Sequence, residues 1–248
     1  MASKIEPRTT NHEPRTTNHE PRLSFYRKIR RFIWRECIFP FISPQNKTLF
    51  LLHLPRKAKL LDVGCGNHSP EHTKKLCPDI YYVGVDVCDY NNDEKSKTLA
   101  DKYIMTSGEN FAETIKNLPD EFDAAVSNHN LEHCNHPMET LDAICSRLKK
   151  GGKLYLAFPS EKSVTFPSRK GSLNFYDDGS HVYLPDFKAV IKRLIRNNGM
   201  SIDFAEASYM PFLAKIIGMF QNRIIRDRAT YYIWCYYGFE TIITAHKK

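Results

Sequence analysis

A buried strand that ends in a tight turn is predicted by the segment Leu60-Leu61-Asp62-Val63-Gly64-Cys65-Gly66-Asn67. The apolar run carries an acid near its end, and a glycine, a spacer and a second glycine begin two residues after that acid. Glycine has no Cβ, so at Gly64 and Gly66 the backbone can take positive φ angles and a ligand can approach the main chain closely. We therefore expect a ligand-binding turn at the edge of a sheet.

A second acid follows at the distance that nucleoside-binding folds use. The apolar run 81–85 ends at Asp86, and 86 − 66 = 20 residues separate this acid from Gly66. A carboxylate at the end of the second strand, about 20 residues after the turn, is placed to hydrogen-bond the two hydroxyls of a ribose. The ligand is expected to carry an adenosine.

Two features of the turn argue against a dinucleotide. The third glycine that packs helix against strand in a GxGxxG turn is replaced by Ser69, and Pro70 follows. Asp62 would repel a pyrophosphate, whereas it would attract the ammonium group of an amino-acid moiety. A nicotinamide dehydrogenase is therefore disfavoured.

At these residues the sequence resembles the class I S-adenosylmethionine-dependent methyltransferases, whose first motif reads (D/E)xGxGxG and whose second ends in an acid for the ribose. His68 stands where that motif has its last glycine. The resemblance covers roughly residues 57–207. It implies a Rossmann-like, doubly wound α/β sheet of seven strands, mostly parallel with an antiparallel last strand, and S-adenosyl-L-methionine as cofactor. The expected cofactor contacts are Asp62, Gly64, Cys65, Gly66, Asp86, Val87, Glu109, Asn110, Asn128 and His129.

Strands and helices alternate along the rest of the chain, as in a parallel sheet with helices on both faces. The expected strands are 59–63, 81–86, 102–105, 122–127, 152–158, 201–206 and 231–245. The expected helices are 70–76, 93–100, 109–117, 137–149, 185–198 and 210–230. The run Lys149-Lys150-Gly151-Gly152, which introduces the strand at 152–158, is interpreted as the C-terminus of the preceding helix with its glycine stop.

Three regions are predicted. Residues 1–22 contain a tandem seven-residue repeat with proline and no apolar side chain, so they are expected to be a disordered tail. Residues 23–56 form a basic and aromatic helical extension, which either caps the active site, the favoured interpretation, or lies on an anionic membrane. Residues 57–248 form the methyltransferase domain. Its apolar stretch 210–220 is expected to contact lipid, a partner subunit or the domain itself, and the sequence does not decide among these.

Composition narrows the class of protein. The chain has 248 residues, a net charge of +8 and seven cysteines without a CxxC pair, and it shows neither a secretory signal nor an apolar run of membrane-spanning length. We expect a cytoplasmic enzyme with reduced thiols, with contact at the inner face of the membrane as an option. A small-molecule partner is expected and a nucleic acid is not; the oligomeric state stays open.

The segment Phe122 to His133 resembles the fourth-strand motif of small-molecule methyltransferases, in which a strand ends in a polar residue and runs into Leu-Glu-His. The resemblance implies that Asn128 or His129 lies near the methionine part of the cofactor and that Leu131 and Glu132 are structural. For His133, a substrate or catalytic role and a backbone-bonded histidine at a helix start are both open.

Three histidines near the end of the fourth expected strand have a spacing that can suggest a metal site. His129, His133 and His136 have the spacing that would align them on one helical face. Asn135 and Pro137 interrupt that helix, so we expect no metal site.

The segment Ser107 to Phe111 occupies the place where the family's third motif contacts the base. Glu109 or Asn110 is expected to bond the exocyclic amine, with Phe111 stacking on the ring. Alternatively, Asn110 is only the N-cap of the following helix.

The loop Leu173-Asn174-Phe175-Tyr176-Asp177-Asp178-Gly179-Ser180-His181 carries the substrate predictions. It resembles the loop of bacterial methyltransferases found with surface-polysaccharide pathways, which favours a sugar, a sugar nucleotide or another polyol as acceptor. Asn174, Tyr176 and His133 are the expected substrate contacts. An Asp-Asp-Gly turn with capping roles is the alternative.

A hydroxyl acceptor has to lose a proton, and histidine titrates near neutrality. We expect methyl transfer to oxygen with His181 or His129 as general base and Asp177 or Asp178 orienting the acceptor or the imidazole. An amine or a quinone ring carbon is the alternative acceptor. N-methylation of a nucleic-acid base is less expected, because Asn128 is not followed by the Pro-Pro of the Asn-Pro-Pro-(Tyr/Phe) motif. A non-catalytic cofactor-binding module is disfavoured by the presence of both acids.

Overall fold

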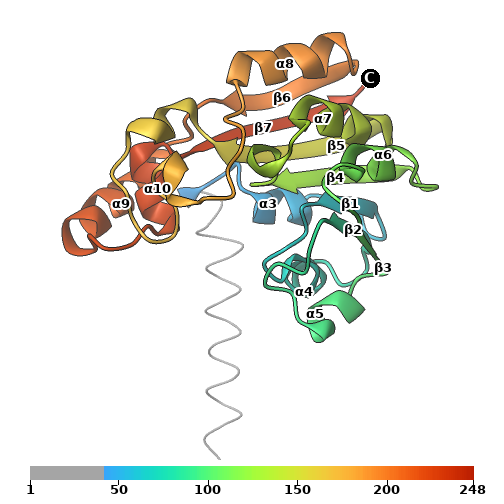
Figure 1. Ribbon diagram of the computed structural model, residues 1–248, viewed down its shortest axis with the longest axis horizontal. Coiled ribbons are helices and arrows are strands. Elements are labelled where there is room, and N and C mark those ends of the chain that lie inside the picture. Colours follow the sequence, from blue (N-terminus) through green and yellow to red (C-terminus); the bar gives the residue numbers. More distant parts are fainter. Residues whose placement is uncertain (1–41) are drawn as a thin grey trace, which may run out of the picture. The chain divides into compact units, whose positions relative to one another are not determined.

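The computed structural model describes residues 42–248, which belong to a compact unit comprising Pro40–Lys248. Seven strands form a single sheet in the order β3-β2-β1-β4-β5-β7-β6 (Figure 1). The strands are β1 (Lys59–Val63), β2 (Tyr81–Asp86), β3 (Lys102–Met105), β4 (Phe122–Asn128), β5 (Leu148–Pro159), β6 (Met200–Glu206) and β7 (Glu240–Lys247). The first five strands pair in parallel, whereas β7 runs antiparallel to β5 and β6. The predicted fold class is confirmed.

Helices cover both faces of the sheet. The helices before and between the first three strands are α3 (Lys47–Leu52), α4 (Ser69–Leu76) and α5 (Glu94–Thr98); those that follow are α6 (Phe111–Lys116), α7 (Pro137–Ser146) and α8 (Phe187–Arg196). One core cluster joins α6, α7 and α8 to one face, through residues such as Ile115, Ile144 and Leu194. The other cluster includes Leu51 of α3 and Tyr82 of β2. Figure 1 shows α6, α7 and α8 together on one side of the sheet.

The strand order places a crevice in the middle of the carboxyl edge. The chain proceeds from β1 to β2 and β3 in one direction and then returns to β4 on the other side of β1. At such a reversal the two loops after the neighbouring strands diverge, and ligands of open α/β sheets bind in the opening. Here the diverging segments follow Val63 and Asn128.

Two sequence predictions of secondary structure are wrong at the C-terminal side. The expected strand 231–245 is a helix, α10 (Tyr231–Tyr237), followed by β7. The Thr230 side chain caps the helix by accepting from Ile233 N, and Gly238 ends it with φ of +72°. The aromatic side chains favour a strand. The two caps and the burial of Ile233 and Cys235 stabilise the helix more than this preference opposes it. The preceding helix, α9 (Phe212–Ile224), is shorter than the expected 210–230.

A third correction concerns the start of β5. The run 149–152 was expected to end a helix, but α7 stops at Ser146 and these residues belong to the strand. Lys149 Nζ donates to Asp123 Oδ1 on the neighbouring strand β4 at 2.6 Å, so this lysine forms an ion pair between the two strands. Gly151, at φ of +75°, turns the chain within the irregular start of β5.

The compact unit begins before residue 57. Leu49 and Leu51 of α3 are buried, and Asn46 caps this helix by accepting from Leu49 N at 2.9 Å. The predicted disordered tail (1–22) and most of the predicted helical extension (23–56) lie outside the described residues. Between residues 42 and 248 every helix falls short of the length and apolar character needed for a membrane crossing.

Candidate functional site

The turn after β1 is narrow and closed by neighbouring side chains. Gly64 has φ of +75°, and a Cβ added there would lie 2.5 Å from Oδ1 of Asn130. A Cβ on Gly66 would lie 3.0 Å from the carbonyl oxygen of Tyr90. Asn92 braces the turn, since its Oδ1 accepts from His68 N and its Nδ2 donates to the carbonyl of Cys65. Both glycines are therefore required by close approach of the chain, and Gly64 by its backbone angle as well.

Cys65 faces the core rather than the ligand side. Its side chain is buried, and its Sγ would lie 2.7 Å from a Cβ on Gly84 of β2. Burial, together with the nearby Asp62 and Asp86, raises the pKa of this thiol far above its ordinary value. Cys65 therefore serves as a small packing side chain, and only its backbone contributes to the ligand-binding turn.

Asp62 is buried at the end of β1, and three side chains hold one of its oxygens. Oδ2 accepts from Ser69 Oγ at 2.6 Å, Tyr82 Oη at 2.8 Å and Lys47 Nζ at 3.2 Å. Oδ1 is buried and has no hydrogen-bond partner among residues 42–248. A buried acceptor without a donor is costly, so this oxygen is suited to a ligand's ammonium group.

Asp86 ends β2 at the same edge of the sheet. Its Oδ1 accepts from Val87 N at 2.7 Å, which fixes the carboxylate against the chain that follows. Burial raises the pKa of Asp86, against the effect of backbone hydrogen bonds that stabilise the anion. The acid is 8% exposed, so it is available to a ligand from one side only.

A pocket opens beside Asp86, between the loops that follow β2, β3 and β4. It is lined by Val87, Gly108, Glu109, Phe111, Ala112, Asn130, His133, Cys134, Asn135, His136, Glu139 and Thr140. Three expected contacts, Val87, Glu109 and His133, thus come together although they are far apart in the sequence. Asn110 stands at the N-cap position of α6, but its side chain makes no capping hydrogen bond.

His129 is held by two acids. Its Nδ1 lies 3.0 Å from Glu132 Oε1, and its Nε2 lies 2.9 Å from Glu240 Oε1 of β7. The ring also packs against Trp234 and Phe239. Burial lowers the pKa of His129, but the hydrogen bonds to both carboxylates outweigh burial and raise the pKa to about 10.

The loop predicted to bind substrate is tied down by its own polar side chains. Asp177 accepts from the backbone of Arg169, Leu173 and Asn174 and from the Ser168 hydroxyl. Burial raises the pKa of Asp177, but these donors lower it by more, to below its usual range. The capping interpretation therefore describes Asp177 well.

Asn174 is also committed to the loop. Its Nδ2 donates to the carbonyl of Phe166 at 2.6 Å, and its Oδ1 accepts from Tyr176 N, at the start of the short 3₁₀ helix η4 (Phe175–Asp177). Tyr176 points to solvent with 74% of its surface exposed. Asp178 accepts from the hydroxyl and the backbone of Ser180.

His181 and His133 meet where this loop docks on the 3₁₀ helix η2 (Leu131–His133). Their ring centroids are 4.8 Å apart. The carbonyl oxygen of Glu132 accepts from the backbone of Val182 and Tyr183, which fixes the loop beside η2. By contrast, His129, His133 and His136 do not share a helix: η2 ends at His133, and His136 is the N-cap of α7.

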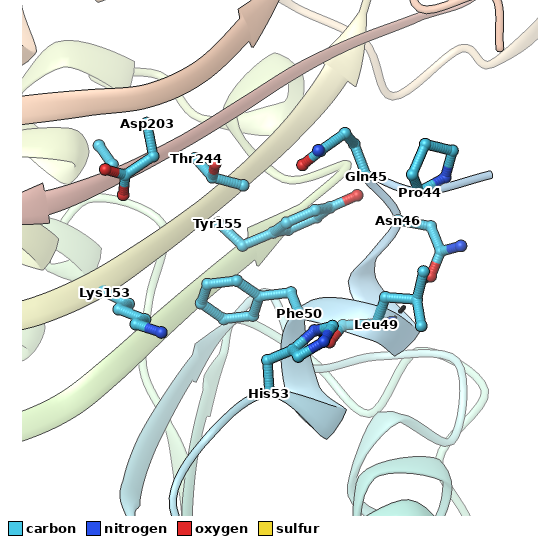
Figure 2. Close-up of a pocket in the computed structure, with 11 residues that line it drawn as sticks. Pro44, Gln45, Asn46, Leu49, Phe50, His53, Lys153, Tyr155, Asp203 and Thr244 are labelled. Carbon is cyan, nitrogen blue, oxygen red and sulfur yellow. Dashed lines mark hydrogen bonds between the residues drawn. The ribbon is translucent and has the colours of Figure 1, made fainter. Parts of the chain in front are cut away.

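A second pocket, shown in Figure 2, lies where α3 meets the face of β5, β6 and β7. The rings of Phe50 and Tyr155 pack within it, with centroids 5.5 Å apart. Its lining shares no residue with the pocket beside Asp86. We therefore do not assign the cofactor to it.

Sequence reasoning missed the contacts that several residues make in the site, namely those of Lys47, Ser69, Tyr82, Asn92 and Asn130. Tyr82 gave a detectable signal, because a phenol in a buried strand needs a hydrogen-bond partner. Its strand partner is Leu60, two residues before Asp62, so both side chains lie on one face.

Comparison with known proteins identifies the family to which this fold and site belong. Residues 33–202 match a family described as a methyltransferase domain. The chain belongs to this family. It is a methyltransferase that uses S-adenosyl-L-methionine as methyl donor, and the unpartnered Oδ1 of Asp62, the glycine turn and Asp86 fit that cofactor.

Solved structures share the fold of this methyltransferase. An S-adenosylmethionine-dependent methyltransferase from Mesorhizobium loti is 17% identical, with a TM-score of 0.52 over 80% of this chain and 97% of the other. A putative methyltransferase of Haloferax volcanii, in complex with the Trm112 activator, is 14% identical, with a TM-score of 0.54 over 90% and 93%. A putative sarcosine dimethylglycine methyltransferase from Galdieria sulphuraria is 13% identical, with a TM-score of 0.52 over 90% and 98%. A search of curated proteins finds no match.

Proposed function

We propose that this methyltransferase transfers the methyl group to a hydroxyl oxygen of a sugar, a sugar nucleotide or a related polyol, as a step of surface-polysaccharide biosynthesis. The observation that carries the proposal is the docking of the loop 173–181 on η2, which brings His181 beside His133 at the wall of the pocket next to Asp86. Polar groups that can activate a hydroxyl thus stand next to the proposed cofactor site.

The proposed cofactor contacts follow from the geometry of the edge. Asp86 would take the ribose hydroxyls, and Oδ1 of Asp62 the ammonium of the methionine part. Val87 and Glu109 line the pocket expected for the adenine, with Asn110 beside them, and the backbone of Gly64, Cys65 and Gly66 forms the turn below. Asn128 ends β4 at the crevice, where it and His129 adjoin the methionine part.

When bound, S-adenosyl-L-methionine supplies a methyl group on a sulfonium, which needs no further activation. The protein has to align the acceptor and keep water out. The acceptor hydroxyl must also lose its proton as its oxygen bonds to the methyl carbon. We assign this activation to Nε2 of His181, because Nδ1 of that ring donates to the carbonyl of Phe175 at 2.6 Å and so leaves the lone pair on Nε2. Asp178 Oδ2, 4.0 Å from Nε2, stabilises positive charge there.

The other proposed catalytic residues take different parts. Both ring nitrogens of His129 are engaged by carboxylates, so we propose that it positions η2 rather than removing a proton. Asp177 is saturated by donors of its own loop and positions that loop. Asn174 does the same, which leaves the exposed Tyr176 and His133 as proposed acceptor contacts.

The test is a turnover assay with the purified full-length chain. Sugar nucleotides, free polyols, amines and quinols are each incubated with the cofactor, and S-adenosylhomocysteine release is measured together with the mass of the product. We expect methylated product from a hydroxyl substrate, lost in His181→Ala and retained in His246→Ala, whose exposed side chain pairs with Asp203 and lies outside the pocket. Turnover of an amine or quinone alone would overturn the proposal in favour of that acceptor class.

We further propose that the enzyme works at the inner face of the membrane through α9. Four apolar side chains recur every fourth residue along this helix and are exposed: Phe212, Ile216, Phe220 and Ile224. The exposed Lys215, Arg223, Arg226 and Arg228 lie on or just after the same helix. An apolar helix face with basic neighbours is the chemistry that anionic bilayers bind.

Vesicle co-sedimentation tests this contact. The protein is expected to pellet with vesicles containing anionic lipid and to stay in the supernatant with neutral ones, and Phe220→Ser/Ile224→Ser should abolish pelleting. The matched variant Tyr90→Ser/Met105→Ser removes exposed apolar side chains elsewhere and should pellet normally. Dimerisation through α9 without lipid binding would contradict the proposal.

A further inference from the structure

Three metal-ligating side chains converge beside the pocket. One donor atom from each of Glu132, His133 and His181 lies within 4.8 Å of the others. The first two come from η2, and the third comes from a loop about 50 residues further along the chain. The backbone bonds between Glu132 and the segment 182–183 hold the two elements together. The grouping is thus built by the fold and is not a chance meeting of surface side chains.

Both imidazoles present a lone pair on the same kind of nitrogen. His181 Nδ1 donates to the carbonyl of Phe175 at 2.6 Å, and His133 Nδ1 lies 3.2 Å from the carbonyl of Ser180. A ring nitrogen facing a carbonyl oxygen must carry the hydrogen, so Nε2 of each ring is left as the acceptor. Donation of the second nitrogen to a backbone carbonyl is also how metal-binding histidines are oriented in proteins.

Glu132 supplies a buried carboxylate with unused capacity. The residue is 0% exposed, and its Oε1 faces Nδ1 of His129. Its Oε2 is buried and has no hydrogen-bond partner among the described residues. An unpaired carboxylate oxygen in the interior is unfavourable unless a cation or a donor reaches it. His181 is nearly as enclosed, with its side chain 5% exposed.

We propose that Glu132, His133 and His181 bind a divalent transition-metal ion, with zinc as the reference case. Two imidazoles and one carboxylate, with a further position open, form a donor set that proteins use for catalytic zinc and for other first-row ions. Ligand atoms about 2 Å from a tetrahedral ion stand roughly 3.3 Å apart, so binding draws the His181 loop inward from its present spacing. His129 is the positioning residue that holds Glu132 Oε1.

The role of the ion rests on the proposed function. His133 lines the pocket beside Asp86 and His181 comes from the loop proposed to hold the acceptor, so a bound ion would lie between the proposed cofactor site and that loop. An acceptor hydroxyl bound to the ion becomes more acidic and loses its proton to solvent as its oxygen takes the methyl group. In this arrangement His181 activates the hydroxyl through the ion, and its Nε2 lone pair is used for coordination.

Metal binding is tested without reference to turnover. Full-length protein carrying His12→Ala/His19→Ala, which removes the repeat histidines, is freed of metal with a chelator and titrated calorimetrically with Zn²⁺, Co²⁺, Mn²⁺ and Mg²⁺. We expect one equivalent of Zn²⁺ or Co²⁺ to bind, with visible Co²⁺ absorption bands typical of a nitrogen and oxygen site, and weak binding of Mg²⁺, which prefers oxygen ligands.

Variants locate the site. His133→Ala and His181→Ala should each weaken Zn²⁺ binding by more than the roughly 10- to 100-fold that loss of an outer partner causes, and should change the Co²⁺ spectrum. His246→Ala, which removes an exposed histidine outside the pocket, is the matched control and should bind as the parent does. Circular dichroism confirms folding. Failure of the parent to bind any of these ions stoichiometrically, or unaltered binding by both variants, overturns the inference.

Turnover then separates the two proposals. If the ion binds and chelation abolishes methylation of a hydroxyl substrate, the metal site and the proposed function are both supported. If the ion binds but only an amine or quinone is methylated, the site stands and the proposed function fails. If methylation of a hydroxyl survives complete removal of metal, the inferred role of the ion is wrong and His181 acts directly as the base.

Discussion

Lys47 places its ammonium 3.2 Å from Oδ2 of Asp62, so a residue ahead of the first strand neutralises the acid at the end of that strand. The Asp62 side chain is 1% exposed and that of Lys47 is 19% exposed. The pair also shares Ser69, whose hydroxyl contacts both groups. Helix α3 is therefore attached to the cofactor turn by charge as well as by apolar packing.

Removing this cation should destabilise the fold. Lys47→Ala leaves a buried carboxylate without its charged partner, so the free energy of unfolding is expected to fall by about 3 kcal/mol. Urea unfolding measures the change. Lys75→Ala is the matched control, because its ion pair with Glu71 lies on the surface, and it should unfold like the parent. Equal unfolding midpoints for the two variants would show that Lys47 is dispensable.

Gly64 and Gly151 allow a matched comparison, since both have φ of +75°. Alanine at either position meets the same backbone cost, about 1–2 kcal/mol. At Gly64 the new Cβ also meets Asn130 at 2.5 Å, whereas at Gly151 nothing lies within 4 Å. Gly64→Ala should therefore have the lower melting temperature and weaker S-adenosylhomocysteine binding in calorimetry. Similar behaviour of the two variants would mean that Asn130 does not close the turn.

Asp86 is predicted to carry cofactor affinity. A hydrogen bond to a charged group contributes about 1.5–3 kcal/mol, so Asp86→Asn should weaken S-adenosylhomocysteine binding by roughly 10- to 100-fold. Asp89→Asn, three residues further on and exposed, should bind as the parent does. Isothermal calorimetry decides, and an unchanged dissociation constant for Asp86→Asn would remove this acid from the cofactor site.

His129 should matter to stability. Its removal leaves the buried Glu132 and Glu240 without the imidazole between them, so His129→Ala is expected to lower the free energy of unfolding by about 3 kcal/mol. His246→Ala, which breaks an exposed pair with Asp203, serves as the control and should have little effect. A His129→Ala protein with parental stability but no turnover would instead point to direct participation in the chemistry.

Thiol labelling should discriminate among the described cysteines. Cys88 is exposed, whereas burial raises the pKa of Cys145 to about 12. Because the thiolate is the reactive form, a raised pKa leaves Cys145 almost wholly protonated at pH 7 and still so at pH 9. Iodoacetamide followed by peptide mass spectrometry should find Cys88 modified at both pH values and Cys145 and Cys65 unmodified. Labelling of Cys145 at pH 9 in folded protein would contradict its burial.

The sequence was sufficient for the features that depend on local pattern. The strand and glycine turn at 60–67, and the acid at the end of β2, follow from apolar runs and from the residue types that break them. The alternation of strands and helices then predicts the parallel sheet. These signals occupy short stretches, so no knowledge of distant contacts is needed to recognise them.

The partners of the site residues could not be predicted in the same way. The contact between His129 and Glu240 joins residues 111 positions apart, and that between Lys47 and Asp62 depends on how α3 packs. The helix α10 was missed because its aromatic residues favour a strand, while its stability comes from packing. The grouping of Glu132 with His181 likewise depends on docking of a loop whose own pattern suggests only a turn.

The position of β7 determines when the sheet can be completed during synthesis of the chain. This strand lies between β5 and β6, and its first residue, Glu240, bonds His129 at the end of β4. A nascent chain emerging from the ribosome thus holds every other strand before it holds the one that separates β5 from β6. Until β7 has been synthesised, β5 and β6 lack the strand between them and His129 lacks its second carboxylate, so this edge of the sheet is completed last.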